Sequence, residues 1–156
     1  MNENLPVIGW REWVQLPDLD IPSIKAKVDS GARSSSIHAP DIETFPRNGR
    51  QWVRFSVAPD QKDATASHEV ESKILEHRYV KSSNGEVTLR PVIVTRIRLL
   101  GKTFHVELTL ADRSEMGFRM LLGREAFRGK FLVDASRSYL GGKRKRKKKT
   151  KPPEQE

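Results

Sequence analysis

The sequence predicts an all-β domain, either a closed barrel or a sandwich, with at most one or two short helices. Several short segments alternate apolar and polar residues, which is the pattern of a strand with one buried face. Clusters of Gly, Pro, Asn and Ser separate these segments. Helical periodicity is scarce. Many short strands punctuated by turns are typical of barrels and sandwiches.

The first half of the chain contains three candidate strands. Residues 10–16 are rich in apolar side chains and end at Pro17. Residues 23–28 alternate, which places Ile24, Ala26 and Val28 on one face, and residues 52–57 alternate in the same way. Residues 40–50 and 59–68 are rich in Pro, Asp, Asn and Gly, and we expect loops there.

The second half predicts two hairpins and one short helix. Residues 104–110 are apolar at every second position, and they follow residues 92–100 across Gly101-Lys102. Residues 79–81 and 86–89 flank the turn signal Ser82-Ser83-Asn84-Gly85. Residues 125–128, before Gly129, form the candidate helix.

Length and charge divide the 156 residues into a domain, residues 1–142, and a basic tail, residues 143–156. The tail carries eight Lys or Arg and two Glu, so most of the formal charge of +9 lies there. It has no apolar side chain to bury, and we expect it to be disordered. Such a tail makes weak contacts with nucleic acid or an acidic protein through counterion release, or it serves only as a solubilising extension.

Several classes of protein are not expected. No apolar run is long enough to span a membrane. The start of the chain lacks the order of a signal peptide, so we expect a cytoplasmic protein. There is no cysteine, which excludes disulfides, thiol catalysis and cysteine-rich zinc sites.

The motif that carries chemistry is Asp29-Ser30-Gly31-Ala32, directly after the candidate strand 23–28. Gly31 permits a tight turn and the Ser30 hydroxyl can hold it. Two such carboxylates, brought close together, share one proton, so that one acts as general base on water and the other as general acid. Asp-Ser-Gly is also a common turn sequence, and a structural role stays open.

A second motif, Leu121-Leu122-Gly123-Arg124, follows about 90 residues later. This order, a strand into Asp-Ser-Gly-Ala, then a flap hairpin and an apolar-Gly-Arg stub, resembles the retropepsins, which are small homodimeric aspartic peptidases. The blocks at residues 8–14, 26–33, 37–39, 90–93 and 116–125 are similar to a bacterial branch labelled ATP-dependent zinc protease. The resemblance spans nearly the whole body and implies a retropepsin-like closed barrel.

The resemblance also implies roles for individual residues. Asp29, Ser30 and Gly31 would be catalytic, and Ala32, Gly123 and Arg124 would support the site. The substrate-binding candidates are Arg33, His38, Lys81, Ser82, Ser83 and Arg90. The position four after the catalytic aspartate, which is often acidic in retroviral peptidases, is Arg33, so we expect Arg124 to pair with Glu125 or another carboxylate instead.

Neither zinc nor ATP is supported as a cofactor by a motif. The nearest string to a zincin helix, His68-Glu69-Val70-Glu71-Ser72, lacks the second His. Gly101-Lys102-Thr103 lacks the upstream glycine of a phosphate-binding loop, because Arg96 takes that place. We therefore predict no metal ligands and no bound cofactor.

Two functions remain open. In the first, two chains form a homodimer whose Asp29 residues hydrolyse an amide, and Arg33, Lys81 and Arg90 favour an acidic, glutamate-rich substrate. In the second, the domain is a catalytically silent binding module for an acidic partner or for an ATP-grasp glutamate ligase, a class of enzyme that the resembling family accompanies, and Asp29 is structural.

Overall fold

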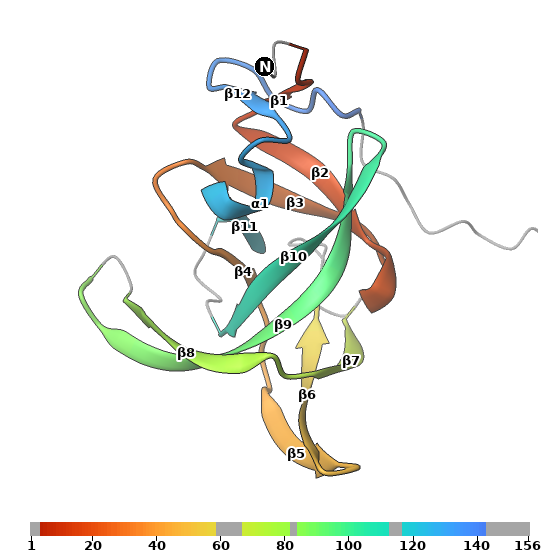
Figure 1. Cartoon of the computed structure of the whole chain (residues 1–156), viewed down its shortest axis with the longest axis vertical. Helices are drawn as coiled ribbons and strands as arrows, with labels where there is room; N and C mark the ends of the chain where they lie inside the picture. The colour runs from red at the N-terminus through yellow and green to blue at the C-terminus, as the bar shows by residue number, and fades with distance from the viewer. Residues whose placement is uncertain (1–3, 59–66, 82–83, 113–116, 143–156) are drawn as a thin grey trace, which may run out of the picture.

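The computed structural model describes residues 4–58, 67–81, 84–112 and 117–142, and its centre is a closed barrel of six strands (Figure 1). The strands pair in the order β10-β4-β11-β3-β2-β9, and β9 pairs with β10 to close the ring. This confirms the all-β prediction and selects the barrel. The barrel strands are β2 (Arg11–Leu16), β3 (Ile21–Asp29), β4 (Ser35–His38), β9 (Val87–Leu99), β10 (Lys102–Ala111) and β11 (Met120–Gly123).

Alternation places the apolar side chains inside this barrel. Ile24, Ala26 and Val28 of β3 are buried, as predicted. They join inward-facing residues of β9, β10 and β11 in one hydrophobic cluster. In the described residues, helix is confined to one turn, α1 (Arg124–Phe127), which lies within a residue of the predicted position, and to a 3₁₀ turn, η1 (Pro17–Leu19).

Both predicted hairpins are present. β9 and β10 pair antiparallel from Leu99↔Lys102 onward. The first part of β9 extends beyond the barrel and pairs with β8 (Glu76–Lys81), from Val92↔Glu76 to Val87↔Lys81. We call β8 and this part of β9 the flap hairpin. β8 is the outer strand of its sheet, so one of its edges has no neighbouring strand among the described residues.

The expectation of a loop over residues 40–50 was wrong for its central part. β5 (Glu43–Arg47) and β6 (Arg50–Val57) form a hairpin around Asn48-Gly49, and both turn residues have positive φ. Asn-Gly is the preferred sequence for such a two-residue turn. Pro46 is tolerated because β5 is an edge strand.

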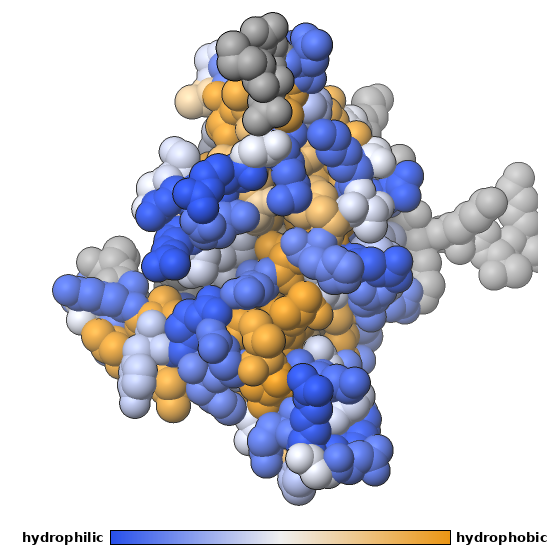
Figure 2. Space-filling model, viewed as in Figure 1, coloured by the Kyte–Doolittle hydropathy of each residue, from blue (hydrophilic) through white to orange (hydrophobic). Residues whose placement is uncertain are grey.

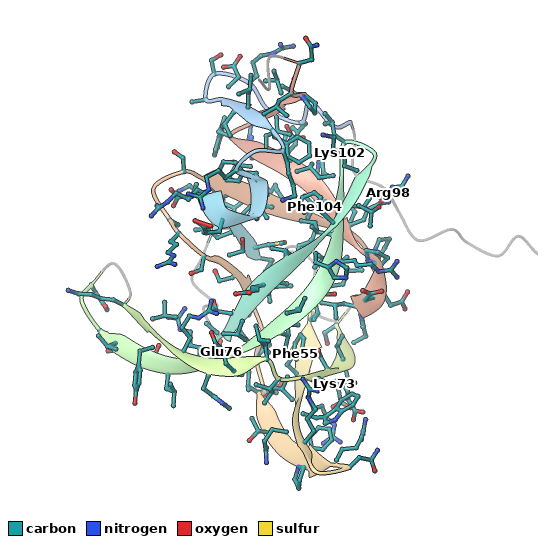
Figure 3. The ribbon with its side chains drawn as sticks, in the orientation of Figure 1. Phe55, Lys73, Glu76, Arg98, Lys102 and Phe104 are labelled. Carbon is teal, nitrogen blue, oxygen red and sulfur yellow. The ribbon has the colours of Figure 1, made fainter. Side chains whose placement is uncertain are left out.

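β6 also pairs with β7 (His68–Lys73), and together β5, β6 and β7 form a separate three-stranded sheet. Of the predicted loop 59–68, residues 59–66 lie outside the described residues, and His68 belongs to β7. Phe55 of β6 is fully buried and joins this sheet to the barrel core (Figure 3).

The first and last strands of the domain lie side by side. β1 (Val7–Gly9) pairs in parallel with β12 (Leu132–Asp134). Residues 137–142, which we call the strap, then run back along β2, where the Tyr139 N–H donates to the Arg11 carbonyl. The predicted tail, residues 143–156, lies outside the described residues. No helix in the described part of the chain is long and apolar enough to cross a membrane.

Candidate functional site

The Asp29 side chain lies where β3 leaves the barrel. Its Oδ1 accepts a hydrogen bond of 2.9 Å from the Gly31 N–H, and the Asp29 carbonyl accepts one of 3.2 Å from the Ala32 N–H. These bonds form a tight turn and fix the carboxylate locally. Asp29 is half-buried, and no ion pair joins it to a side chain within the described ranges. One oxygen of the carboxylate is therefore held while the other stays available.

The motif Leu121-Leu122-Gly123-Arg124 lies against the Asp29 turn and holds it in place. β11 runs parallel to β3, with Gly123 opposite Asp29. The Arg124 N–H donates to the Ala32 carbonyl at 2.8 Å, and the Gly123 N–H donates to the Ser35 hydroxyl at 3.0 Å. A Cβ on residue 123 would lie 2.5 Å from the Ser34 carbonyl oxygen. The close backbone crossing therefore requires glycine at this position.

Arg124 differs from expectation in its partner. Its Nη1 donates to the backbone carbonyls of Ser30 and Gly31, at 3.4 and 3.3 Å. Glu125, the carboxylate proposed for it, pairs with Arg128 at 2.8 Å instead. The guanidinium of an arginine can donate to two carbonyls as readily as to a carboxylate, and here Arg124 holds the Asp29 turn through its backbone carbonyls.

A cavity of about 900 Å³ opens beside this turn, between it and the flap hairpin (Figure 2). Four separate segments form its wall, and Asp29 itself is not part of the lining. The lining residues are Arg33, Ser34, Ser35, Glu76, Arg78, Tyr79, Val80, Lys81, His105, Val106, Glu107, Glu125 and Ala126. Glu76 lies at the start of β8, below β10 (Figure 3).

Some of the charged side chains that line this cavity form ion pairs, and others do not. Arg78 is bonded to Glu76 and, at 3.0 Å, to Glu107, and these hydrogen bonds raise the pKa of its guanidinium. In the described part of the chain, Arg33 and Lys81 form no ion pair. The two cations that remain for a ligand therefore come from opposite walls, one from the turn after Asp29 and one from the flap hairpin.

The other predicted substrate-binding residues lie elsewhere. His38 is buried, with its Nδ1 3.8 Å from Asp112, and Arg90 is buried in β9, where its Nε donates to the Thr88 hydroxyl at 2.9 Å. Neither lines the cavity. Ser82 and Ser83 lie outside the described residues. Sequence reasoning missed Glu107 and noted Arg78 only as a basic residue near the flap, although the pairing of the two predicted hairpins would have placed both on one outer face.

The donor set does not fit a zinc centre. His38, His68, His77 and His105 belong to four different strands, and the His68 ring nitrogen bonds to the Leu19 carbonyl. Across the described ranges, no three His, Asp or Glu side chains are grouped to hold a metal ion.

Comparisons with known proteins agree with this geometry. A family model described as "RimB-like: Retropepsin-like aspartic endopeptidase RimB" matches residues 7–144. A solved structure of a protein of unknown function from Legionella pneumophila superposes with a TM-score of 0.72 at 27% identity, covering 87% of this chain and 98% of that one.

Curated relatives carry a different name. A "Probable alpha-L-glutamate ligase" of Shewanella halifaxensis is 50% identical over 91% of this chain, and one of Parasynechococcus marenigrum is 44% identical over 87%. The chain spans less than a third of their length, 31% and 29% respectively. The family match and the braced Asp29 turn confirm the resemblance seen in the motifs: the chain belongs to the RimB-like family of retropepsin-like aspartic endopeptidases.

Proposed function

We propose that this domain is an aspartic peptidase whose active site forms when two copies bring their Asp29 carboxylates together. The observation that carries the proposal is the Asp29 turn: a carboxylate held by the Gly31 N–H, braced from behind by Arg124, and without an ion-pair partner in the described part of the chain. The sequence contains one Asp-Ser-Gly-Ala, so the second carboxylate comes from a second copy.

The chemistry follows from two carboxylates that share one proton. The ionised carboxylate takes a proton from a bound water as its oxygen attacks the amide carbon. The protonated carboxylate donates to the carbonyl oxygen. The tetrahedral intermediate then collapses: one of its hydroxyls returns a proton to the ionised carboxylate, the C–N bond breaks, and the other carboxyl donates to the leaving nitrogen the proton that it took from water. The Asx turn at Asp29 keeps the carboxylate in position, which lowers the cost of reaching that geometry.

The substrate class we propose is an acidic protein tail, such as a glutamate-rich one. Arg33 and Lys81 are the cavity cations that have no ion pair in the described residues, and they would each attract a substrate carboxylate. The free edge of β8 lies beside the same cavity and would accept an extended peptide as an added strand. Arg78 contributes little to this selection because Glu76 and Glu107 already neutralise it.

Exposed apolar side chains on the flap hairpin support pairing with a second copy. Tyr79, Val87 and Leu89 are 73%, 56% and 52% exposed. Tyr79 and Leu89 are opposite each other in the β8–β9 ladder, so their side chains share one face. Covering such a face would remove apolar surface from water.

A second candidate function rests on the curated relatives. They are named glutamate ligases and are about three times as long as this chain. In that alternative the domain is a binding module that docks on a ligase or delivers an acidic partner to it, and Asp29 only shapes its turn.

The substitution Asp29→Asn tests the first candidate. The full chain is incubated with a protein that ends in a glutamate-rich tail and with generic peptides, and cleavage is followed by mass spectrometry. We expect Asp29→Asn to lower the rate at least about 10²-fold, because it removes the general base and the shared proton. The matched control is Asp41→Asn, an exposed aspartate at positive φ, a conformation that asparagine also accepts.

Three other results would contradict the proposal. One is cleavage that survives in Asp29→Asn. Another is wild-type cleavage abolished by a chelator, since the mechanism uses no metal. The third is wild-type protein that stays monomeric at assay concentrations by sedimentation yet remains active. Wild-type protein that cleaves nothing but binds a glutamate ligase would favour the second candidate.

A further inference from the structure

Six side chains form a closed ring of aromatic and cationic groups, in which Arg11, Trp13 and Lys25 of β2 and β3 meet Trp10, Phe118 and Tyr139 from outside these strands. The Arg11 guanidinium lies 4.6 Å from the Trp10 ring and 4.9 Å from the Tyr139 ring. Tyr139 stacks on Trp13 at 5.9 Å, with 20° between the planes. We call this set of residues, completed by Lys25 and Phe118, the aromatic–cation ring.

Lys25 and Phe118 close the ring. The Lys25 Nζ lies 6.0 Å from the Trp13 ring and 5.3 Å from the Phe118 ring. Phe118 then meets Trp10 edge to face at 6.0 Å. All six side chains are half-buried, so each keeps part of its surface in water.

The cations of this ring are not neutralised by carboxylates. Arg11 donates its Nε to the Ser138 hydroxyl at 3.1 Å, and Lys27, exposed beside the ring, is opposite Arg11 in the β2–β3 ladder. Within the described ranges, no ion pair to Asp or Glu involves Arg11, Lys25 or Lys27. This face therefore carries an uncompensated positive charge.

The three-stranded sheet provides an internal comparison. There, Arg47 and Arg54 also lie over the aromatic rings of Phe45 and Trp52, at 4.5 to 5.0 Å. Both arginines, however, are paired with Glu71, and Arg54 also with Glu43. The two stacked arginines of this sheet are thus balanced by carboxylates, unlike Arg11 and Lys25, whereas Lys73, 6.0 Å from the Trp52 ring, forms no ion pair within the described ranges.

The cations and aromatic rings of the aromatic–cation ring indicate what kind of ligand it would bind. Unpaired cations attract phosphates, and partly exposed aromatic faces offer stacking surfaces for bases. An acidic peptide would use the cations and leave the aromatic rings without a role. The strap that carries Tyr139 continues directly into the eight Lys and Arg of residues 143–156, so further positive charge begins a few residues from the ring.

We infer that the aromatic–cation ring, with Lys27 beside it, binds single-stranded nucleic acid. Single strands are favoured over duplexes because their bases are free to stack on side chains. This inference does not depend on the proposed peptidase activity: Asp29→Asn should bind the strand as wild type does, and loss of either function leaves the other measurable.

Fluorescence anisotropy with a labelled oligouridylate of about 12 nucleotides tests the inference on the full chain. The variant Lys25→Gln/Lys27→Gln should weaken binding about tenfold at about 50 mM salt and flatten the slope of log K against log salt by about 1.4, since each phosphate neutralised on a single strand contributes about 0.7. Trp13→Leu should weaken binding about fivefold or more with the slope unchanged, because it removes stacking and no charge.

The matched control is Lys102→Gln/Lys130→Gln. These lysines also lie over aromatic rings, Phe131 and Phe104, at 5.4 and 5.3 Å, and they carry the same charge (Figure 3 labels Lys102 and Phe104). Their loss should change affinity less than about twofold, a size of effect expected of distant charges screened by salt. Thermal unfolding of each variant verifies that the fold is retained.

Intrinsic fluorescence locates the contact. In a Trp52→Phe background only Trp10 and Trp13 remain, and oligouridylate should quench them whereas polyphosphate of equal charge should not. The inference is overturned if a glutamate peptide of equal charge binds as tightly at the same salt, which would make this a surface for acidic proteins. It is also overturned if deletion of residues 143–156 abolishes binding while the Lys25→Gln/Lys27→Gln variant binds as wild type.

Discussion

Replacing the buried Glu12 should loosen the end of the domain. Glu12 is fully buried in β2, and its carboxylate accepts three backbone N–H groups: Gly9 at 2.7 Å, Leu140 at 2.9 Å and Gly141 at 2.9 Å. Two of these donors belong to the strap and the third to β1. One side chain thus ties together the beginning of the domain, a barrel strand and the strap.

The variant Glu12→Gln preserves the shape and removes the charge. Oε2 accepts two of the bonds and Oε1 one, so the best placement puts the new NH₂ at Oε1, facing the Gly141 N–H. A buried donor left without an acceptor costs about 1–3 kcal/mol, and the remaining two bonds lose their charge assistance. The variant no longer has the desolvation penalty of a buried charge, which offsets part of this cost. We expect a net loss of about 2–4 kcal/mol in the free energy of unfolding.

Urea unfolding of the full chain at neutral pH measures this loss, and thermal unfolding should shift by about 10 °C for a domain of this size. The control is Glu69→Gln, an exposed side chain 3.8 Å from Arg54, for which the expected loss is below about 0.5 kcal/mol. Near-ultraviolet circular dichroism should change only in Glu12→Gln, since the strap carries Tyr139 against Trp13. If Glu12→Gln unfolds within about 1 kcal/mol of wild type, the three N–H groups find other acceptors and the reasoning fails.

Three further predictions test the fold and the tail. Gly123→Ala forces a methyl group against the Ser34 carbonyl and should cost about 1–3 kcal/mol in urea unfolding; wild-type stability would contradict the close crossing. The hydrogen bond from Arg96 lowers the pKa of Asp18, so this pair stabilises the fold above the usual carboxyl pKa of about 4 and loses its effect as pH falls through the lower, folded value. Thermal unfolding at about pH 7 to 3 should therefore show a shallower acid loss for Asp18→Asn than for wild type. Deleting residues 143–156 should leave the unfolding temperature unchanged, because they offer no apolar surface to bury, and an unfolded product would show that they pack on the domain.

The strands that alternation predicts are those with one face in the core. β3 over most of its length, the second half of β9 and the middle of β10 bury every second side chain, and the sequence indicates these strands clearly. β4 gave no such signal because all four of its residues are buried, between β10 on one side and β11 on the other. β5 was hidden by Pro46 and by its exposed side chains, although Asn48-Gly49 marked its turn.

The residues of the candidate site also differ in whether the sequence predicts them. Asp29 and Gly123 belong to short contiguous motifs, so the sequence locates them. The partner of Arg124 was not predictable, since its acceptors are backbone carbonyls of the turn and no side-chain pattern reports them. The cavity is assembled from four segments, and only the register of β8 on β9 and of β9 on β10 brings Arg78 to Glu107.

The pairing of β1 with β12 has a consequence for how such a domain is built into larger proteins. Because Val7 is opposite Leu132, the first and last strands of the domain lie next to each other at its surface (Figure 1). A second domain joined ahead of β1 would therefore begin beside β12 and be held at a high effective concentration near the domain, without any change to the barrel. The Asp29 turn, the flap hairpin and the cavity are formed by residues between β1 and β12, so these elements form a unit that a longer chain can carry, and the ligase-named relatives are about three times as long as this chain.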